Sequence, residues 1–277
     1  MNTPNNRSKT NRKLSETERA DVEGRLRPRV PMLYEIIRKE GEAELVRPVS
    51  GLWWSGVAAG LCIGFSMISE GLLQAYLPDT GWRPLLENLG YSVGFLIVIM
   101  GRQQLFTENT ITAVLPVMAE KSLANLWCML RLWGVVLAAN IAGAFLFAAF
   151  CGLDGLFSTE VRTAFSVIAR HLMDMDAMDM FWRGIIAGWL IATLVWILPN
   201  SEGGEVLMIV LITYLIALGD FTHIIAGSVE AFWLIFNGDL GIVEMLAGFF
   251  MPTLLGNVVG GTLLFAMISY AQVQDEI

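Results

Sequence analysis

Few side chains in this 277-residue sequence could do chemistry inside an apolar environment. His223 is one of two histidines, and it closely follows a long apolar run. Imidazole changes its charge near neutral pH, so His223 could offer a hydrogen bond or a proton to a weak-acid anion. Thr107 could add a hydroxyl that donates to, or accepts from, the same ligand. The alternatives are a buried histidine bonded to a backbone carbonyl, and a threonine bonded one helical turn back.

Both residues lie at breaks in apolar segments. One apolar run extends over 85–101 and meets the polar stretch 102–109, and a second extends over 206–219 and meets 220–223. Polar backbone at membrane depth survives only where protein or a water-filled cavity satisfies it, and a matched pair of interrupted helices indicates a transport site. We therefore expect pore or substrate contacts from six residues of these breaks: Leu105, Phe106, Thr107, Phe221, Thr222 and His223.

Four further residues of the breaks carry a charge or an amide: Arg102, Glu108, Asn109 and Asp220. Ionisable groups at membrane depth are functional candidates whose partner has to be identified. We expect this set to gate the pathway or to form an ion pair, with Arg102 paired to Glu108. Two other carboxylates, Glu70 and Glu230, are expected near the outer membrane interface, in contact with water.

The composition indicates that these breaks belong to a membrane protein. Apolar residues make up 55% of the chain and charged residues 16%, and the mean hydropathy is +0.58. Soluble domains have about 45–50% apolar and about 25% charged residues, so a water-soluble enzyme is not expected. Since a helix needs about 20 apolar residues to cross a bilayer, six spans are predicted: 51–77, 84–116, 122–152, 177–199, 204–236 and 243–271.

The distribution of charge predicts the orientation of the chain. Residues 1–48 contain 11 of the 18 Lys and Arg residues, which favours a cytoplasmic N-terminus. An even number of spans returns the C-terminus to the same side. We expect a disordered cytoplasmic tail at 1–30 and an amphipathic helix at 31–48, followed by a channel domain at 49–277. The amphipathic helix could lie on the membrane surface or lead, with a solvated face, into the first span.

Short internal matches predict two halves. Trp-Ser-Gly-Val-Ala-Ala-Gly at 54–60 matches Trp-Arg-Gly-Ile-Ile-Ala-Gly at 182–188, and Asn-Ile-Ala-Gly at 140–143 matches Asn-Val-Val-Gly at 257–260. Each half would hold three spans, and because three is odd the second half enters the membrane upside down. The predicted fold is an all-α membrane protein of six transmembrane helices, built as two inverted three-helix repeats with broken second and fifth helices.

The motifs at the breaks resemble those of the formate/nitrite transporter family. Gly-Arg-Gln-Gln-Leu-Phe-Thr at 101–107 is similar to the Gly-x-x-x-Leu-Phe-Thr loop of that family. Gly-Asp-Phe-Thr-His at 219–223 is similar to its Gly-Phe-x-His loop, with one residue inserted. Gly-Asn-Val-Val-Gly at 256–260 also resembles the family. The sequence departs from the family at Gln104, where an acidic residue is usual, and at Glu108, where a small one is usual.

The resemblance implies an aquaporin-like protomer in a homo-pentamer of a bacterial inner membrane, with one pore per protomer for a small anion or its neutral weak acid. Leu105, Phe106 and Phe221 would form hydrophobic constrictions that exclude hydrated ions. A permeant that took a proton near the histidine would avoid the cost of a bare anion in a low-dielectric constriction.

Other functions stay open on the sequence alone. A pore for small neutral solutes is favoured by Glu108, which would reduce the attraction of anions, and a poorly conducting structural or regulatory pentamer is a further possibility. A membrane enzyme is not expected, because no Ser-His-Asp set, HExxH motif or phosphate-binding loop is visible. We expect no metal and no cofactor, since the three cysteines lie in apolar runs. The basic tail is a topology signal, so the expected partner is the lipid bilayer and not nucleic acid.

Overall fold

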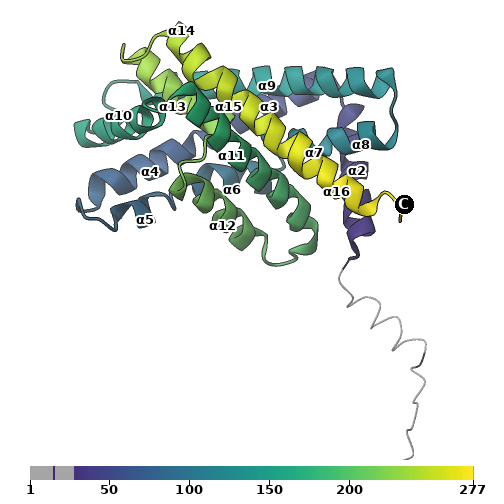
Figure 1. Cartoon of the computed structure of the whole chain (residues 1–277). Coiled ribbons are helices and arrows are strands. Elements are labelled where there is room, and N and C mark those ends of the chain that lie inside the picture. Colours follow the sequence, from purple (N-terminus) through teal and green to yellow (C-terminus); the bar gives the residue numbers. More distant parts are fainter. Residues whose placement is uncertain (1–14, 16–27, 277) are drawn as a thin grey trace, which may run out of the picture.

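The computed structural model describes Ser15 and residues 28–276, and all regular structure in that part is helical (Figure 1). This agrees with the predicted fold class, while the expected disordered tail lies almost entirely outside the described residues. The helices of the first half are α2 (Val30–Leu45), α3 (Val49–Ile63), α4 (Phe65–Tyr76), α5 (Arg83–Glu87), α6 (Ser92–Met100), α7 (Phe106–Thr112), α8 (Val114–Ala119) and α9 (Leu123–Cys151).

The remaining helices begin with one that the sequence did not predict. The expected outer segment 153–176 contains α10 (Thr159–Met173), which Ser158 caps by accepting from the Val161 amide and which packs on α4 and α13. The others are α11 (Ala177–Ile197), a 3₁₀ turn (Leu198–Asn200), α12 (Glu205–Leu218), α13 (Ile224–Phe236), α14 (Ile242–Glu244), a π-helical segment (Met245–Phe250), α15 (Met251–Val258), a second π-helical segment (Val259–Ala266) and α16 (Met267–Val273).

Within the described part of the chain, four helical stretches are long and apolar enough to cross a membrane: Val49–Tyr76, Leu123–Cys151, Ala177–Asn200 and Ile242–Val273. They coincide with the first, third, fourth and sixth predicted spans. The other two predicted spans are each divided into shorter helices. The first of them contains α6 and α7, separated by residues 101–105, and the second contains α12 and α13, separated by residues 219–223. The interruptions therefore fall where the polar residues predicted them.

Close helix packing brings these elements together. In α3, Gly60 faces the carbonyl oxygen of Asn140 and the backbone of Gly143 on α9 so closely that a β-carbon would overlap them. In α11, Gly188 faces the backbone of Asn257 on α15 in the same way. Small residues at such positions let membrane helices approach at backbone distance. The Trp-x-Gly-x-x-Ala-Gly match of the sequence thus corresponds to two similar helix crossings.

The amphipathic N-terminal segment forms α2, which packs with α7, α8, α9 and α16. Its apolar side chains Leu33, Tyr34 and Ile37 are buried, so much of the apolar face contacts protein. On the other face of α2, the guanidinium of Arg38 bonds the carboxylate of Glu35 and holds the pKa of Glu35 below its ordinary value. Contact of α2 with a membrane surface stays a prediction.

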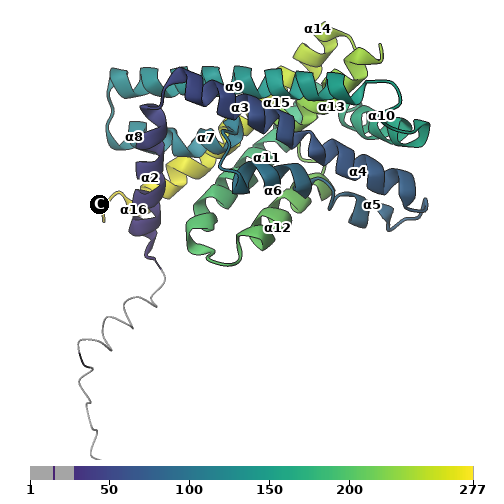
Figure 2. The same cartoon turned by 180° about the vertical axis from the view of Figure 1, so that it is seen from behind.

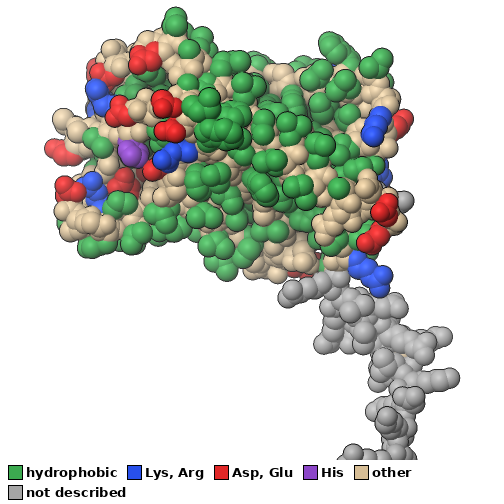
Figure 3. All heavy atoms as spheres, in the orientation of Figure 1, with side chains coloured by type: hydrophobic (Ala, Val, Ile, Leu, Met, Phe, Trp, Pro, Cys, Tyr) green, Lys and Arg blue, Asp and Glu red, His purple; other side chains and the backbone are tan. Residues whose placement is uncertain are grey.

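The surface carries a broad apolar band. On the face drawn in Figure 3, charged side chains gather towards the two ends of the molecule, and hydrophobic side chains cover the middle. Exposed apolar residues of α12, including Val206, Leu207 and Leu211, contribute to the apolar surface. α2, which begins the continuous described chain, and the C-terminal end lie at the same end of the molecule, opposite α5 and α10, in both views (Figures 1 and 2).

Candidate functional site

The side chains of Thr107 and His223 meet where the two interrupted helices come together. The Thr107 hydroxyl oxygen lies 2.7 Å from Nε2 of His223, although 116 residues separate the two in the chain. Both side chains are almost fully buried. The ring of Phe95, on α6, meets the imidazole edge-on at a centroid distance of 5.0 Å. The two residues that the sequence singled out are therefore direct neighbours.

The helix that follows His223 fixes the orientation of its imidazole. His223 is the N-cap of α13, and its Nδ1 accepts a hydrogen bond of 3.3 Å from the amide of Ala226. A neutral imidazole has one donor and one acceptor nitrogen, so with Nδ1 accepting, the proton is assigned to Nε2. Nε2 then donates to the Thr107 oxygen. This arrangement leaves the hydroxyl hydrogen of Thr107 available to a ligand.

Two asparagines hold the breaks with matching hydrogen bonds. Oδ1 of Asn140 accepts from the amide of Phe106 at 2.8 Å, and Oδ1 of Asn257 accepts from the amide of Ile224 at 2.9 Å. In each case the amide belongs to the first residue of the helix after the break. Since the first amides of a helix have no partner within it, each asparagine satisfies one that would otherwise be orphaned.

The donor atoms of the same asparagines bind the other side of each break. Nδ2 of Asn140 donates to the carbonyls of Gly56 and Gln104, both at 2.8 Å. Nδ2 of Asn257 donates to the carbonyls of Gly184 and Thr222, both at 2.9 Å. Each carboxamide thus links its break to a neighbouring helix, which is α3 for Asn140 and α11 for Asn257. It also supplies a donor to one carbonyl of the break.

The chain leaves the first helix of each pair through the same left-handed turn. Arg102 has φ 50° and Asp220 has φ 51°, and they are the positive-φ residues other than glycine in the described chain. The next amide, of Gln103 or Phe221, donates to a carbonyl five residues back, at 3.0 and 2.9 Å. This is the Schellman ending of a helix, which glycine usually provides. Here two charged residues take that conformation.

These matching turns set the correspondence between the two breaks. The loops align Gly101 with Gly219, and four residues later they align Leu105 with His223, each of which is the N-cap of the next helix. The Phe-Thr pairs at 106–107 and 221–222, which look alike in the sequence, occupy different positions. Thr107 and His223 are therefore not equivalents, and only one break places an imidazole at its helix start.

A comparison with known proteins identifies the family. The profile described as Formate/nitrite transporter matches residues 31–271. The chain is 47% identical over 255 residues to the Inner membrane protein YfdC of Escherichia coli (strain K12), an alignment that covers 92% of this chain and 82% of that protein. The chain belongs to the formate/nitrite transporter family. Since the family consists of channels and transporters, the prediction that the protein is not an enzyme is confirmed.

Solved structures share the fold of this family member. A structure titled "Pentameric formate channel with formate bound" matches with a TM-score of 0.71 at 20% identity, over 82% of this chain and 98% of that one. A second, titled "FNT family ion channel", matches with a TM-score of 0.74 at 18% identity, over 88% and 98%. The shared fold therefore extends beyond the two breaks and covers most of the chain.

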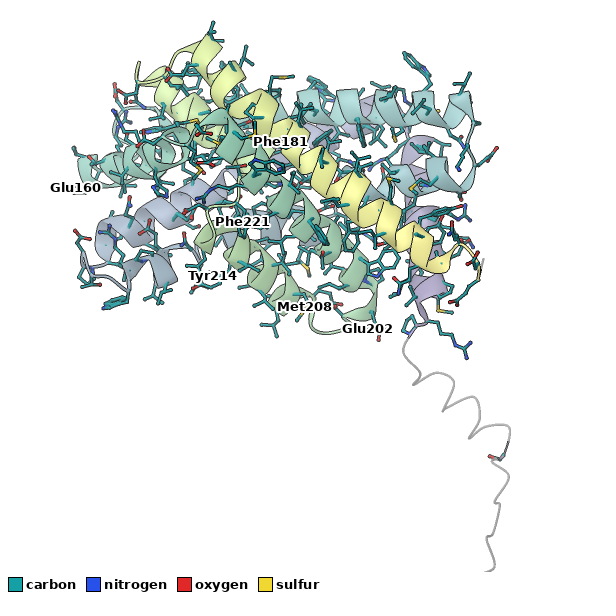
Figure 4. All side chains as sticks on the ribbon, viewed as in Figure 1. Glu160, Phe181, Glu202, Met208, Tyr214 and Phe221 are labelled. Carbon is teal, nitrogen blue, oxygen red and sulfur yellow. The ribbon has the colours of Figure 1, made fainter. Side chains whose placement is uncertain are left out.

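The other predicted pore residues of this family member line the breaks in different ways. Leu105, Phe106 and Thr222 are buried, and the hydroxyl of Thr222 donates to the Met180 carbonyl at 2.7 Å. The ring of Phe106 packs edge-on against Trp133 at 5.8 Å. Phe221 borders a cavity at the second break, and in Figure 4 it lies beyond Tyr214, at the end of α12 away from Glu202.

The expected ion pair between Arg102 and Glu108 does not form. Arg102 is exposed and bonds Glu40 of α2 at 3.1 Å. Oε1 of Glu108 is buried and has no hydrogen-bond partner among the described residues. Asn109 holds the first break, since its Nδ2 donates to Oε1 of Gln104 at 3.1 Å. The sequence could not reveal the Glu40 contact, which joins residues 62 positions apart.

Asp220, in the second break, is paired on the protein surface. Its Oδ1 lies 3.1 Å from Nε2 of His171 on α10, and its Oδ2 lies 3.6 Å from a guanidinium nitrogen of Arg183 on α11. Arg183 also donates to the Gly219 carbonyl at 3.2 Å. The pairs tie the second break to two helices. Their effect on gating stays a prediction.

A cavity of about 290 Å³ reaches the imidazole from the end of the molecule that carries α5 and α10. Among its lining residues are His223, Tyr91, Glu70 and Glu230. Glu70 and Glu230 are only 5% and 6% exposed, so they face this cavity and not the outer surface, and their position near the outer interface stays a prediction. No periodicity of the sequence distinguishes a carboxylate that faces such a cavity from one at the membrane surface.

Proposed function

We propose that this protein is a membrane channel or transporter for small monovalent weak acids of the formate or nitrite type, which pass the Thr107–His223 pair. The observation that carries the proposal is the 2.7 Å contact between these side chains, because it joins the breaks of two interrupted helices. Interrupted helices of this kind place binding groups in the pathway of many transporters. Membership of the formate/nitrite transporter family supports the class of permeant.

The pair suits a permeant that can exist as an anion or as a neutral acid. The available hydroxyl hydrogen of Thr107 would donate to an anion, and His223 would exchange a proton with it. Leu105, Phe106 and Phe221 would surround this position with apolar groups, so that a hydrated ion could not replace its water there. A permeant that crosses these groups as the neutral acid avoids the desolvation cost of a charge.

The proposed architecture is six spans in two inverted three-helix repeats, with both termini cytoplasmic. The matched asparagine bonds and left-handed turns support the repeat, and the basic N-terminal segment supports the orientation. We further propose a homo-pentamer in the bacterial inner membrane. A solved relative of the same fold is titled a pentameric channel, and the relative from Escherichia coli is named an inner membrane protein.

A pore for small neutral solutes is the second candidate, and the acidic lining favours it. Glu70 and Glu230 face the cavity that leads to His223, and Glu108 follows Thr107 in α7. Carboxylates so placed would lower the local concentration of anions. Both candidate functions use the same pathway and differ in the charge of the permeant.

Uptake into proteoliposomes tests the two candidates. Radiolabelled formate and nitrite, and the neutral solutes glycerol and urea, would be compared at two pH values with protein-free liposomes as the baseline. Uptake of formate or nitrite above the baseline, faster at the lower pH, is expected. Uptake of neutral solutes alone would favour the second candidate, and no uptake of any solute would favour a structural or regulatory pentamer.

A further inference from the structure

The short helix that carries Thr107 depends on other spans for part of its hydrogen bonding. α7 has seven residues, and a helix of this length leaves most of its carbonyls without a partner inside it. Nε1 of Trp133, on α9, donates to the Asn109 carbonyl at 2.9 Å. The hydroxyl of Thr262, on the last span, donates to the Thr110 carbonyl at 2.6 Å. The helix is therefore held by side chains from both halves of the chain.

The donor Thr262 lies in an irregular part of the last span. It belongs to the second π-helical segment, Val259–Ala266, which packs on α7. π-Helical turns within α-helices are frequent at functional sites. The preceding residue, Gly261, faces the side chain of Thr110 so closely that a β-carbon would overlap its hydroxyl oxygen. The last span therefore approaches α7 closely enough for a hydroxyl to reach the backbone of α7.

The contact reaches Thr107 through one further hydrogen bond. The hydroxyl of Thr110 donates to the Thr107 carbonyl at 2.7 Å, and Thr110 is completely buried. Thr262 binds the carbonyl of Thr110, and Gly261 lies against its side chain. A residue that is bonded to Thr107 is thus restrained at two places by the last span.

The second break has no such contact in the corresponding place. Thr262 corresponds to Phe145, since each follows the asparagine of its half by five residues. α9 continues through Phe145 as a regular α-helix, and the ring of Phe145 packs edge-on against Phe232 and Phe236 of α13 at 5.3 and 5.0 Å. The repeated architecture therefore does not require a hydroxyl here. The hydroxyl occurs where the last span meets the helix of Thr107.

A small displacement of α7 would separate the central pair. The Thr107 hydroxyl oxygen lies 2.7 Å from Nε2 of His223, and a hydrogen bond is lost beyond about 3.5 Å. A shift of about 1 Å is therefore enough to break this bond. Since a helix as short as α7 is not stable through its own hydrogen bonds, its contacts with other spans decide its position.

We propose that Thr262 is a positioning residue, whose hydroxyl holds α7 where Thr107 can accept a hydrogen bond from His223. The bond from Thr262 fixes the carbonyl of Thr110, and the bond from Thr110 to Thr107 extends this restraint to the central pair. The effect on transport rests on the proposed function. The geometry of the pair does not, because it exists in the protein without a permeant.

Proton–nitrogen NMR of the imidazoles tests this geometry independently of transport. The chain has two histidines, so full-length protein with isotope-labelled histidine shows two imidazole groups. His171 is exposed, and fast exchange of its hydrogen with water distinguishes it from His223. At about pH 8, where a free imidazole is neutral, Thr107→Val should shift the Nε2–H signal of His223 because it removes the acceptor. Thr262→Val should shift the signal in the same direction, and Thr262→Ser, which keeps the hydroxyl, should leave it in place.

Thr193→Val is the matched control, because the hydroxyl of Thr193 donates to the Trp189 carbonyl of its own helix at 2.9 Å. It should leave the His223 signal in place. Thr262→Ala is a second variant without the hydroxyl and should act as Thr262→Val does. A signal unchanged by either, or shifted equally by the control, would overturn the proposal. If neither assembles while Thr262→Ser does, the hydroxyl serves the fold as a whole, and the proposal is wrong.

Uptake kinetics test whether the position of Thr107 matters to the permeant. Thr262→Val should raise the half-saturating concentration of formate or nitrite about fivefold, the factor that corresponds to one lost hydrogen bond. In protein that already carries Thr107→Val, the same change should have no further effect, because Thr262 acts through Thr107. Additive effects of the two changes would overturn that route. If the unmodified protein takes up no weak acid, the proposed function fails, and the NMR signal still decides the positioning.

Discussion

Asn140 and Asn257 each make the same three hydrogen bonds, one to the helix after a break, one to the break itself and one to a neighbouring helix. Both side chains are completely buried. A buried amide that uses its donor and acceptor atoms in this way fixes the backbone on either side of it. The positions of Thr107 and His223 therefore depend on two asparagines that bond the residues next to them in the chain.

Replacement of Asn257 by Leu, which has a similar size, should destabilise the protein strongly. It would leave the Ile224 amide and the carbonyls of Gly184 and Thr222 without their partner, at about 1–3 kcal/mol for each unsatisfied buried group. Thermal unfolding of the purified protein measures the loss. Asn125→Ala, at the start of α9, is the control and should change stability by less than about 1 kcal/mol. Equal stability of Asn257→Leu and the control would contradict the role given to this amide.

Gly60→Ala should prevent the close crossing of α3 and α9. The added methyl group would overlap the backbone of Asn140, which cannot move without disturbing the first break. Gly134→Ala is the matched control, because nothing lies within 4 Å of its β-carbon position. The control should be neutral or more stable by about 0.5–1 kcal/mol, since glycine is unfavourable within a helix. Yields of assembled protein in size-exclusion chromatography compare the two, and a Gly60→Ala yield equal to that of Gly134→Ala would disprove the crossing.

Substitutions at Arg102 should follow the cost of its left-handed backbone. Arg102→Gly removes that cost together with an exposed ion pair to Glu40, which contributes little. Arg102→Val places a β-branched residue at positive φ and should be less stable than the glycine variant by about 1–2 kcal/mol. Thermal unfolding of the two variants gives the order. Valine at least as stable as glycine would mean that residue 102 does not hold this conformation in solution.

The sequence predicted the parts of the fold that depend on hydrophobic runs and their interruption. The polar stretches after Gly101 and Gly219 located both breaks, and the repeated Asn-x-x-Gly motif indicated two corresponding halves. That its asparagines bind the breaks was not predicted, because those hydrogen bonds depend on the packing of the helices. The sequence did not show which residues of the two breaks correspond. The two Phe-Thr pairs look alike but occupy different positions, whereas the turns at Arg102 and Asp220 align the breaks. Helix α10 was missed because its segment is polar and was assigned to the outside.

Of the candidate site, only the central Thr107–His223 pair could be predicted from the sequence. Thr107 and His223 stood out as polar residues within apolar runs, and the structure joins them. Partners of charged side chains were not predictable, since Arg102 bonds Glu40 and Asp220 bonds His171 across helices that the sequence does not place side by side. The buried environment of Glu70 and Glu230 depends on the packing of α4, α10 and α13, which no local pattern encodes.

The proton taken up with each permeant is the most direct test of the role of the Thr107–His223 pair. Proteoliposomes with a trapped pH indicator, given a radiolabelled weak acid, measure both quantities at once. The account predicts one proton per permeant for the unmodified protein and for Thr107→Val, which should be slower. His223→Asn keeps a hydrogen bond but cannot exchange a proton, and it should lose uptake by at least about tenfold or transport without protons. His223→Asn transport at the unmodified rate, with one proton per permeant, would contradict the account.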